Sequence, residues 1–478
     1  MPLTPVPIAD GQVSGVDDLG AAASSVVNLD IDEAGINRPR PPLNTHSVTG
    51  LGASPVIGSV HWNGYLIVVT ADRYIYSIPD ALPTVATARS TSTATTQLEG
   101  SASRVTFALG EDYVYIAGGG QIQRWGPSLA TSEVLSNSPP CTHICALGNY
   151  LIANDLDNPD RIRWSDIGEG AWTSWPAANF TTVDARPDPV LGVYENANEL
   201  YVLGDETCQV YGLGADPTLP FEVVATTNTG LGATYAATRL DDRFAFFDDK
   251  RRIVVGDGRS VEVISDAIQK TLRDLTTVSD CWMYREERGQ HSYIVVRFPT
   301  EVRTFAYHMK TQRWSELKKY TAPFQGDFPV SSYTYWPRHN YHMFGSTAAA
   351  GGLYRYGTGQ ELSSPLVCER ITGWQDFGSA ERKQSNEIRV VMRRGTAAQG
   401  ATPGALEIRR QCDDGPWSEW QQISIGVPSD YAQVKRVFMR RIFRRCRYHL
   451  RYSNTDNTSI VALYDDVTPL SDGAEVAA

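Results

Sequence analysis

Long hydrophobic runs are missing from this 478-residue sequence. Aliphatic stretches such as YLIVV at 65–69 fall far short of the roughly 20 apolar residues that a membrane-spanning helix requires. The opening MPLTPVPIADGQ has neither the basic start nor the apolar centre of a secretion signal. We therefore expect neither a membrane anchor nor secretion.

Cysteine is scarce, and its spacing excludes a disulfide framework. The seven cysteines are an odd number, and no two of them form a CxxC pair. A chain of this length also has no need of disulfides to supplement a small core. We expect reduced thiols in a cytoplasm.

The motifs of the common enzyme classes are absent as well. We find no GxxxxGK[ST], HExxH, GxSxG or GxGxxG, which excludes the usual phosphate-binding loop, zinc protease, hydrolase and dinucleotide signatures. Glycosidases need two carboxylates across a cleft, and the many acidic residues here do not single out a pair. We predict that the protein is not an enzyme and has no catalytic residues and no cofactor.

Three short segments contain possible metal ligands, but none makes a convincing site. CTHIC at 141–145 offers three soft ligands on one strand face and lacks the fourth that zinc prefers. DLDNPDR at 155–161 lacks the twelve-residue calcium pattern and is better explained as a polar loop between strands. His339 and His342 lie at an expected hairpin corner, where solvated or partner-facing histidines are the simpler interpretation. We predict no metal site.

Composition is that of a folded soluble protein, but charge is unevenly distributed. The chain is 42% hydrophobic and 20% charged, with a net charge of −11. Residues 380–452 contain fifteen Lys and Arg against seven Asp and Glu, a local net charge of +8, so the remainder carries about −19. Such a basic segment is typical of a nucleic-acid footprint, or of a surface that meets an acidic partner.

A repeat of strand pairs dominates the middle of the chain. Hairpin-like units begin roughly 40 to 50 residues apart, a period typical of four-stranded propeller blades. Their starts lie near residues 59, 104, 142, 190, 236, 281 and 332. Corners such as WNGY, LGNY and ENANE suit tight turns, and the strands after them are continuously apolar, as expected between stacked sheets. We favour a six- or seven-bladed β-propeller over a β-sandwich for 51–360.

Other segments of the chain do not follow this repeat of strand pairs. One helix is predicted at 265–276, with Ser265 or Asp266 as N-cap and an apolar stripe of Ile268, Leu272 and Leu275. Residues 1–50 resemble an extended arm, 361–470 a small antiparallel β-sandwich, and 471–478 a flexible tail. The fold class expected overall is all-β.

Two features of the C-terminal region are candidate functional elements. In QCDDGPWSEWQQ at 411–422 we expect a hairpin with a DG corner, in which Asp413 accepts backbone N–H bonds and Gly415 completes the turn. Trp417 and Trp420 would then cover the open end of the sheet. In the following strand Cys446, Tyr448, Leu450 and Tyr452 alternate with Arg445, Arg447, His449 and Arg451, which predicts one buried face and one exposed basic face.

The sequence resembles a known family of bacteriophage proteins. The segment from RQCDDGPWSEW to VALYD is similar to the C-terminal signature of the packaged-DNA stabilisation proteins of short-tailed bacteriophages. RIRWSDIGEGAWTSW and VEVISDAIQKTLRDL resemble central signatures of that family, and VVNLDIDEAGINRPRP weakly resembles its N-terminus. The similarity is strong in the last 80 residues and diffuse in the expected blades.

The resemblance implies a structural protein of the virion tail. A protein of this family would form a ring, as a homohexamer, below the portal and adaptor, and would be assembled in the bacterial cytoplasm. It would retain packaged DNA, let duplex DNA pass through the lumen without sequence recognition, and anchor tail fibres or spikes. We expect Arg445, Arg447 and Arg451 to contact an acidic neighbouring ring or subunit. The alternative function is a propeller that binds or cleaves glycans.

Overall fold

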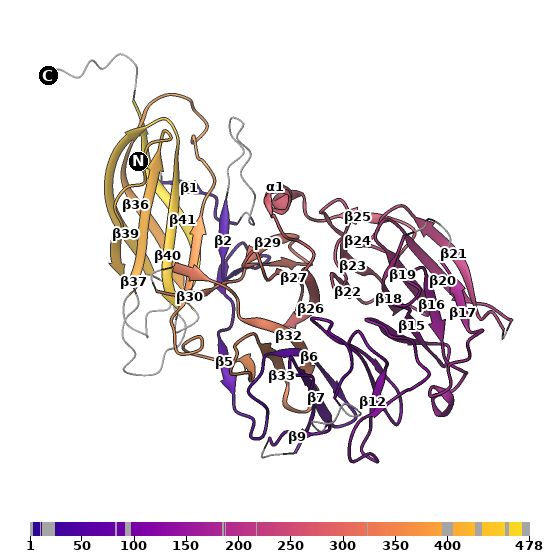
Figure 1. The fold of residues 1–478 in the computed structure, drawn as a ribbon. Helices are drawn as coiled ribbons and strands as arrows, with labels where there is room; N and C mark the ends of the chain where they lie inside the picture. The colour runs from indigo at the N-terminus through magenta and orange to yellow at the C-terminus, as the bar shows by residue number, and fades with distance from the viewer. Residues whose placement is uncertain are drawn as a thin grey trace.

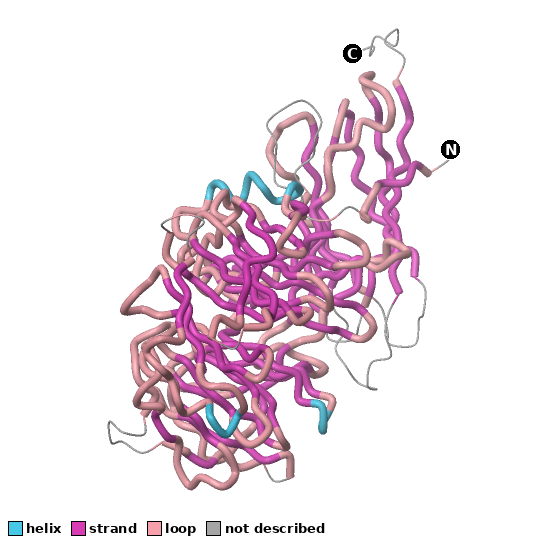
Figure 2. Tube along the Cα trace, turned by 90° about the vertical axis from the view of Figure 1, so that its right-hand side faces the viewer, coloured by secondary structure: helices cyan, strands magenta, loops and turns pink. Residues whose placement is uncertain are grey.

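Four-stranded antiparallel groups follow one another along most of the chain in the computed structural model. The structure describes residues 3–9, 11, 24–81, 84–90, 97–183, 186, 188–216, 218–322, 324–393, 405–425, 433–454 and 458–470. The expected tail at 471–478 lies outside the described residues. Strands dominate the described part (Figure 2), and none of the described helices is long and apolar enough to cross a membrane.

The first five groups are separate sheets, each ordered as its strands follow in the chain. Their strands are β6 Val56–Trp62, β7 Tyr65–Thr70, β8 Ile75–Pro79 and β9 Thr87–Ala88; β10 Thr106–Leu109, β11 Val114–Ala117, β12 Gln123–Trp125 and β13 Glu133–Val134; β14 Ile144–Leu147, β15 Tyr150–Asn154, β16 Arg161–Trp164 and β17 Phe180–Thr182; β18 Val190–Asn196, β19 Glu199–Gly204, β20 Cys208–Leu213 and β21 Phe221–Thr227; and β22 Ala237–Arg239, β23 Phe244–Phe247, β24 Ile253–Gly256 and β25 Val261–Val263.

Two further groups complete the series. The sixth is β26 Trp282–Arg288, β27 His291–Phe298, β28 Arg303–His308 and β29 Arg313–Glu316, and the seventh is β32 Val330–Trp336, β33 Tyr341–Ser346, β34 Leu353–Tyr356 and β5 Leu43–His46. A small hairpin of β30 Lys319–Thr321 and β31 Phe324–Gly326 lies between them. The first and last groups adjoin, since the hydroxyls of Ser59 and Ser332 are 3.0 Å apart. The repeat of strand pairs is confirmed.

Turn chemistry explains why the hairpins form where the sequence predicts them. Asn63 and Gly64 between β6 and β7 both have positive φ, +44° and +80°, which two-residue hairpin turns require. Gly148 and Asn149 do the same between β14 and β15. Because the next strand in each case is buried on both faces, it is continuously apolar instead of alternating.

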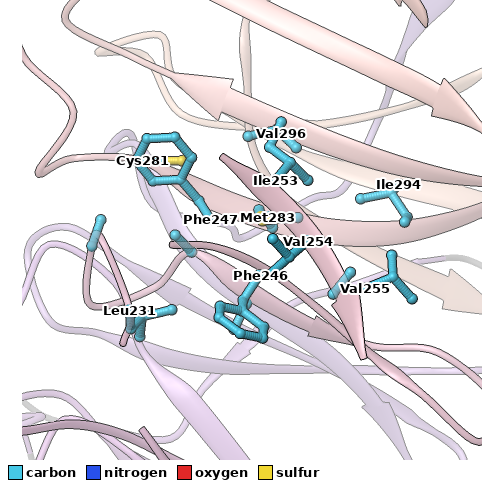
Figure 3. Packing of buried hydrophobic residues seen from close by; sticks show 14 of the residues in the cluster. Leu231, Phe246, Phe247, Ile253, Val254, Val255, Cys281, Met283, Ile294 and Val296 are labelled. Atoms are coloured by element: carbon cyan, nitrogen blue, oxygen red, sulfur yellow. The ribbon is translucent and has the colours of Figure 1, made fainter. Parts of the chain in front are cut away.

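Apolar side chains of neighbouring groups form the largest core. Figure 3 shows Phe246, Ile253 and Val254 of β23 and β24 near Met283 and Ile294 of β26 and β27. Each sheet is therefore covered by its neighbour, which is the environment that the continuous strands indicate.

The short helical segment lies where the sequence predicts it. It consists of a 3-10 turn, η2 Asp266–Ile268, and α1 Gln269–Asp274. Ile268, Leu272 and Leu275 are all buried, so the predicted apolar stripe is confirmed. Ser265 does not cap the helix, because its hydroxyl accepts the backbone N–H of Ile253 at 3.0 Å. Two other 3-10 turns are η1 Glu169–Ala171 and η3 Pro337–His339.

A second body, made of two facing sheets, follows the propeller-like part (Figure 1, orange to yellow). One sheet contains β36 Lys383–Arg393, β39 Gln433–Phe443 and β41 Ser459–Pro469, and the other contains β35 Leu366–Ile371, β37 Ala405–Cys412, β38 Gln421–Ser424 and β40 Cys446–Asn454. Ile388 and Val390 of the first sheet share one apolar cluster with Leu406 and Leu450 of the second.

The N-terminal segment is built into both bodies instead of standing apart as an arm. β1 Thr4–Val6, β3 Leu29–Ile31 and β4 Asn37–Pro39 join the sheet of β41, whereas β5 completes the seventh group. β2 Ser25–Val27 pairs with both β29 and β35, which makes β26 to β29 and the C-terminal strands one nine-stranded sheet. These strands have only three or four residues, too few for a periodic pattern to reveal them.

Candidate functional site

The hairpin corner at 412–415 is a tight turn centred one residue earlier than the sequence predicts. Asp413 and Asp414 occupy its two positive-φ positions, at +47° and +60°, and the Gly415 N–H donates to the Cys412 carbonyl at 2.9 Å. The corner therefore depends on the two aspartates, with Gly415 after them instead of at the centre. Asp413 accepts the backbone N–H groups of Arg444 and Arg445, each at 2.9 Å, as expected.

The tryptophans of this hairpin lie over the arginine face of the sheet, not over its open end. The set of side chains involved, the arginine–tryptophan ladder, consists of Trp374, Trp417, Trp420, Arg409, Arg445, Arg447, Arg451 and His449. The guanidinium carbon of Arg447 is 4.9 Å from the ring centre of Trp374 and 5.2 Å from that of Trp417. Arg409 lies between Trp417 and Trp420 at 4.9 and 4.3 Å. Cations and indole faces therefore alternate along the sheet.

Partners within the chain also satisfy the charges of this face. Arg445 pairs with Asp414, and Arg451 pairs with Glu407 at 2.6 Å. Arg447 donates to the side-chain oxygen of Gln411 at 2.8 Å. The three arginines are half-buried, so the face is less open than the alternating pattern indicates. Their role in contacting a partner stays a prediction.

His449 is the buried centre of the ladder. Burial lowers its pKa, although a hydrogen bond to Glu369, with the two atoms 3.1 Å apart, acts in the opposite direction. Both indole rings of the hairpin contact its imidazole, at centre distances of 5.7 and 4.8 Å. The opposite face of β40 is buried as predicted: Cys446, Tyr448, Leu450 and Tyr452 all belong to the apolar cluster between the two sheets.

The openly exposed basic surface is the strand β39, which the sequence reasoning did not single out. Within the described part of the chain, β39 pairs only with β36, so it forms the edge of its sheet. Val434, Phe438 and Ile442 are 56%, 77% and 52% exposed, and Arg436 and Arg440 are exposed between them. The alternation of apolar and basic residues in QVKRVFMRRIF was the sequence pattern that could have indicated this exposed surface.

The segments considered as metal sites are occupied by other contacts. Cys141 and Cys145 lie in different apolar clusters, and the ring nitrogens of His143 are bonded to Thr142 and Tyr194. Among the described residues no group of three or more His, Cys, Asp or Glu side chains is arranged to hold a metal ion. The loop at 155–161 is a polar turn in which Asp155 accepts the N–H of Asp157 at 3.0 Å.

The two histidines near the β32–β33 corner have partners inside the chain. His339 lies 3.1 Å from the carbonyl of Asp80, and His342 lies 2.9 Å from the hydroxyl of Tyr333. Both are half-buried. The expectation that they are solvated or face a partner stays a prediction.

A match to a protein-family model shows to which family this chain is related. A family model described as "Bacteriophage P22 Gp10, beta-propeller" matches residues 46–352. The chain belongs to this family. The match covers the strand repeat, whereas the resemblance in the sequence was strongest in the last 80 residues, outside it. Membership in the P22 Gp10 family confirms the suspected relationship to phage DNA-stabilisation proteins.

Solved structures with some similarity include one described as a propeller. The WD40 β-propeller domain of Doa1 shares 10% identity over 66% of this chain and 96% of its own, with a TM-score of 0.43. The computationally designed Ika8 protein shares 11% over 66% and 100%, with a TM-score of 0.40. PorZ of Porphyromonas gingivalis shares 11% over 80% of this chain and 46% of its own, with a TM-score of 0.38. No curated protein matches the sequence.

Proposed function

We propose that this member of the P22 Gp10 family is a non-enzymatic hub of a bacteriophage tail. Copies of the chain form a closed ring, a homohexamer, that adjoins the portal and adaptor, retains packaged DNA and anchors fibres or spikes. The seven groups of strands act as the blades of one propeller, and the C-terminal sheets act as a sandwich that contacts neighbours. Membership in a phage family and the all-β fold support this proposal.

The placement of exposed apolar residues is the main observation that supports a ring of several copies. Thirteen large apolar side chains of the described residues are exposed, and seven of them gather at two edges. Three are on β39, and four lie on or beside the β20–β21 hairpin: Leu213, Leu219, Val223 and Val224. β39 and β21 lie at opposite ends of the molecule (Figure 1).

Two different surfaces at opposite ends suit a head-to-tail contact. When one surface of a subunit meets the other surface of the next, repetition closes a ring if the rotation fits. Charge favours the same pairing, since Arg436 and Arg440 are exposed on β39, Asp216 is exposed in the β20–β21 loop, and Glu222 is exposed on β21. An edge strand with apolar side chains is also prone to pair with another chain.

The cavities within one chain are too small to form the DNA channel. One cavity of about 180 Å³ is lined by residues of all seven groups and a second of about 520 Å³ by residues of the first five, and Phe107, His143 and Tyr194 line both. A duplex whose major groove alone is about 12 Å wide does not fit such spaces. The DNA lumen of the proposed ring is therefore formed between copies of the chain.

The test compares charge insertions at the two edges with a control elsewhere. Phe438→Glu and Val223→Glu each place a carboxylate in the proposed contact. The control, Ile167→Glu, places a carboxylate outside it, at a residue that is 61% exposed and belongs to neither edge. We expect the first two variants to lose ring formation on the portal–adaptor complex in electron micrographs, and the control to retain it. Rings formed equally by all three variants would contradict the proposal.

The alternative, a propeller that binds or cleaves glycans, is tested on the same preparations. The purified protein should leave host lipopolysaccharide and peptidoglycan intact, and it should leave DNA intact as well. Sugar release that follows the pure protein, together with failure to form rings, would replace the hub with the glycan function.

A further inference from the structure

The smaller central cavity is lined by residues from all seven groups of strands. It has a volume of about 180 Å³, and its lining includes Ser59, Arg104, Tyr235, Trp282, Tyr284 and Ser332. These residues belong to the first strand of their group or to the segment just before it. The cavity is therefore a fixed feature at the centre of the repeat and does not belong to the C-terminal surfaces.

Arg104 brings a positive charge to this cavity without a compensating carboxylate. Its guanidinium carbon lies 3.7 Å from the ring centre of Trp282, and one of its nitrogens donates to the carbonyl of Ser331. Burial lowers the pKa of Arg104 to about 9, with Arg297 as the next cause, so the group remains a cation at neutral pH. Arg104 is half-buried, and no ion pair joins it to an acidic side chain among the described residues, although charges removed from water are normally paired.

Other hydrogen-bond donors of the cavity lining are also unused. The indole N–H of Trp282 and the hydroxyl of Tyr284 are buried and have no hydrogen-bond partner in the described part of the chain. Trp282 and Tyr284 are 3% and 7% exposed and stack on each other at 5.0 Å. An indole N–H can only donate, and a buried donor without an acceptor is costly. Trp282 and Tyr284 thus lack an acceptor, and Arg104, whose hydrogen bond goes to the neutral carbonyl of Ser331, lacks a negatively charged partner.

Stacking holds these groups in place. Tyr333 stacks on Tyr284 at 5.1 Å, and the hydroxyl of Tyr235 donates to the Arg104 carbonyl at 3.2 Å. The row from Arg104 through Trp282 and Tyr284 to Tyr333 is therefore fixed before any ligand arrives. Such preorganisation lowers the entropy lost on binding.

We propose that the central cavity binds a small oxyanion, a phosphate or a carboxylate group, through the guanidinium of Arg104. The anion supplies the missing negative charge and accepts hydrogen bonds from groups that otherwise have no acceptor. A planar guanidinium suits both oxyanions because it donates two parallel hydrogen bonds. The volume limits the ligand to a small ion or the end group of a larger molecule. This site does not depend on the proposed ring.

Isothermal titration calorimetry of the full chain with inorganic phosphate and, separately, with acetate tests the site. We expect saturable binding of one anion per chain, and the difference between the two titrations distinguishes phosphate from carboxylate as the preferred group. Arg104→Met should weaken binding at least about tenfold, the effect of losing a charge-assisted hydrogen-bond pair. Arg104→Lys, which keeps the charge, should bind with intermediate affinity.

A matched control separates the cavity from arginines in general. Arg355 also stacks on an aromatic ring, that of Tyr341 at 4.4 Å, but it lies outside the cavity lining. Arg355→Met should bind as the wild type does. If Arg104→Met does not fold, crystals of the wild type soaked in selenate decide the question by the position of the anomalous peak. No binding by the wild type, equal binding by Arg104→Met, or selenate found only elsewhere would overturn the proposal.

Discussion

Replacing Glu361 by glutamine removes the negative member of an ion pair that holds the N-terminal segment against the rest of the chain. Arg40 and Glu361 are 2.6 Å apart, and both side chains are completely buried. Arg40 also donates to the side-chain oxygen of Asn28 at 2.9 Å and to the carbonyl of Lys318 at 3.0 Å. The guanidinium is therefore fixed in place and cannot reach water once its partner is neutral.

The magnitude follows from the burial of both charges. At 2.6 Å the Coulomb attraction amounts to about 6 kcal/mol for an effective dielectric constant of about 20. Desolvation offsets much of this in the intact pair, but a cation left without its partner retains the desolvation cost. Loss of one member of a buried pair typically costs about 3–5 kcal/mol. We expect Glu361→Gln to lower the free energy of unfolding by an amount in this range.

Denaturant unfolding followed by tryptophan fluorescence measures the effect, with an exposed pair as control. Arg186 and Glu206 are 2.7 Å apart, but their side chains are 50% and 59% exposed. Glu206→Gln should therefore change stability by at most about 1 kcal/mol. Adding Arg40→Met to Glu361→Gln should recover part of the loss, because it removes the uncompensated charge. Equal losses in Glu361→Gln and Glu206→Gln, or no recovery in the double variant, would show that burial does not make the Arg40–Glu361 pair costly to break.

Three further predictions concern the core, the ladder and the response to acid. Leu272→Ala should cost about 2–5 kcal/mol because Leu272 is fully buried, whereas Asp274→Ala at an exposed position of the same helix should be nearly neutral in thermal unfolding. Trp420→Ala removes the ring under Arg409 and Arg451 and should cost about 0.5–2 kcal/mol per lost contact, with Trp420→Phe less affected; an unchanged unfolding midpoint would show that the ladder contributes nothing. Burial lowers the pKa of His143 to about 3, so its neutral form stabilises the fold above pH 6.5 and this contribution is lost as the pH falls toward 3, by about 2 kcal/mol at pH 5. Between pH 7 and pH 5 the free energy of unfolding should fall less in His143→Gln than in the wild type. An equal fall in both proteins would contradict this prediction.

The repeat was predictable because each unit encodes its own turn and strands. Asn63 and Gly64 adopt the positive φ that their residue types favour, and the apolar run that follows is buried as its composition predicts. The helix was predictable for a similar reason, since Ile268, Leu272 and Leu275 fall on one face. These features depend on residues close together in the sequence.

The features that the sequence did not predict depend on contacts between segments that are far apart in the chain. β5 completes a sheet with β34, about 300 residues away, and nothing in four residues indicates such a partner. Strand alternation correctly assigned the two faces of β40, but it did not indicate that Trp374 and the hairpin tryptophans cover the arginine face. The aromatic positions were recognised as unusual, yet their direction is set by how β37 and β40 pair.

Electron microscopy of the purified protein mixed with the portal–adaptor complex is the decisive test of the proposed ring. We expect a closed ring of six copies on that complex, with β39 of each copy against the β20–β21 hairpin of the next and an open lumen along the symmetry axis. Single copies that do not assemble on the portal–adaptor complex, or a ring in which both of these edges face solvent, would contradict it.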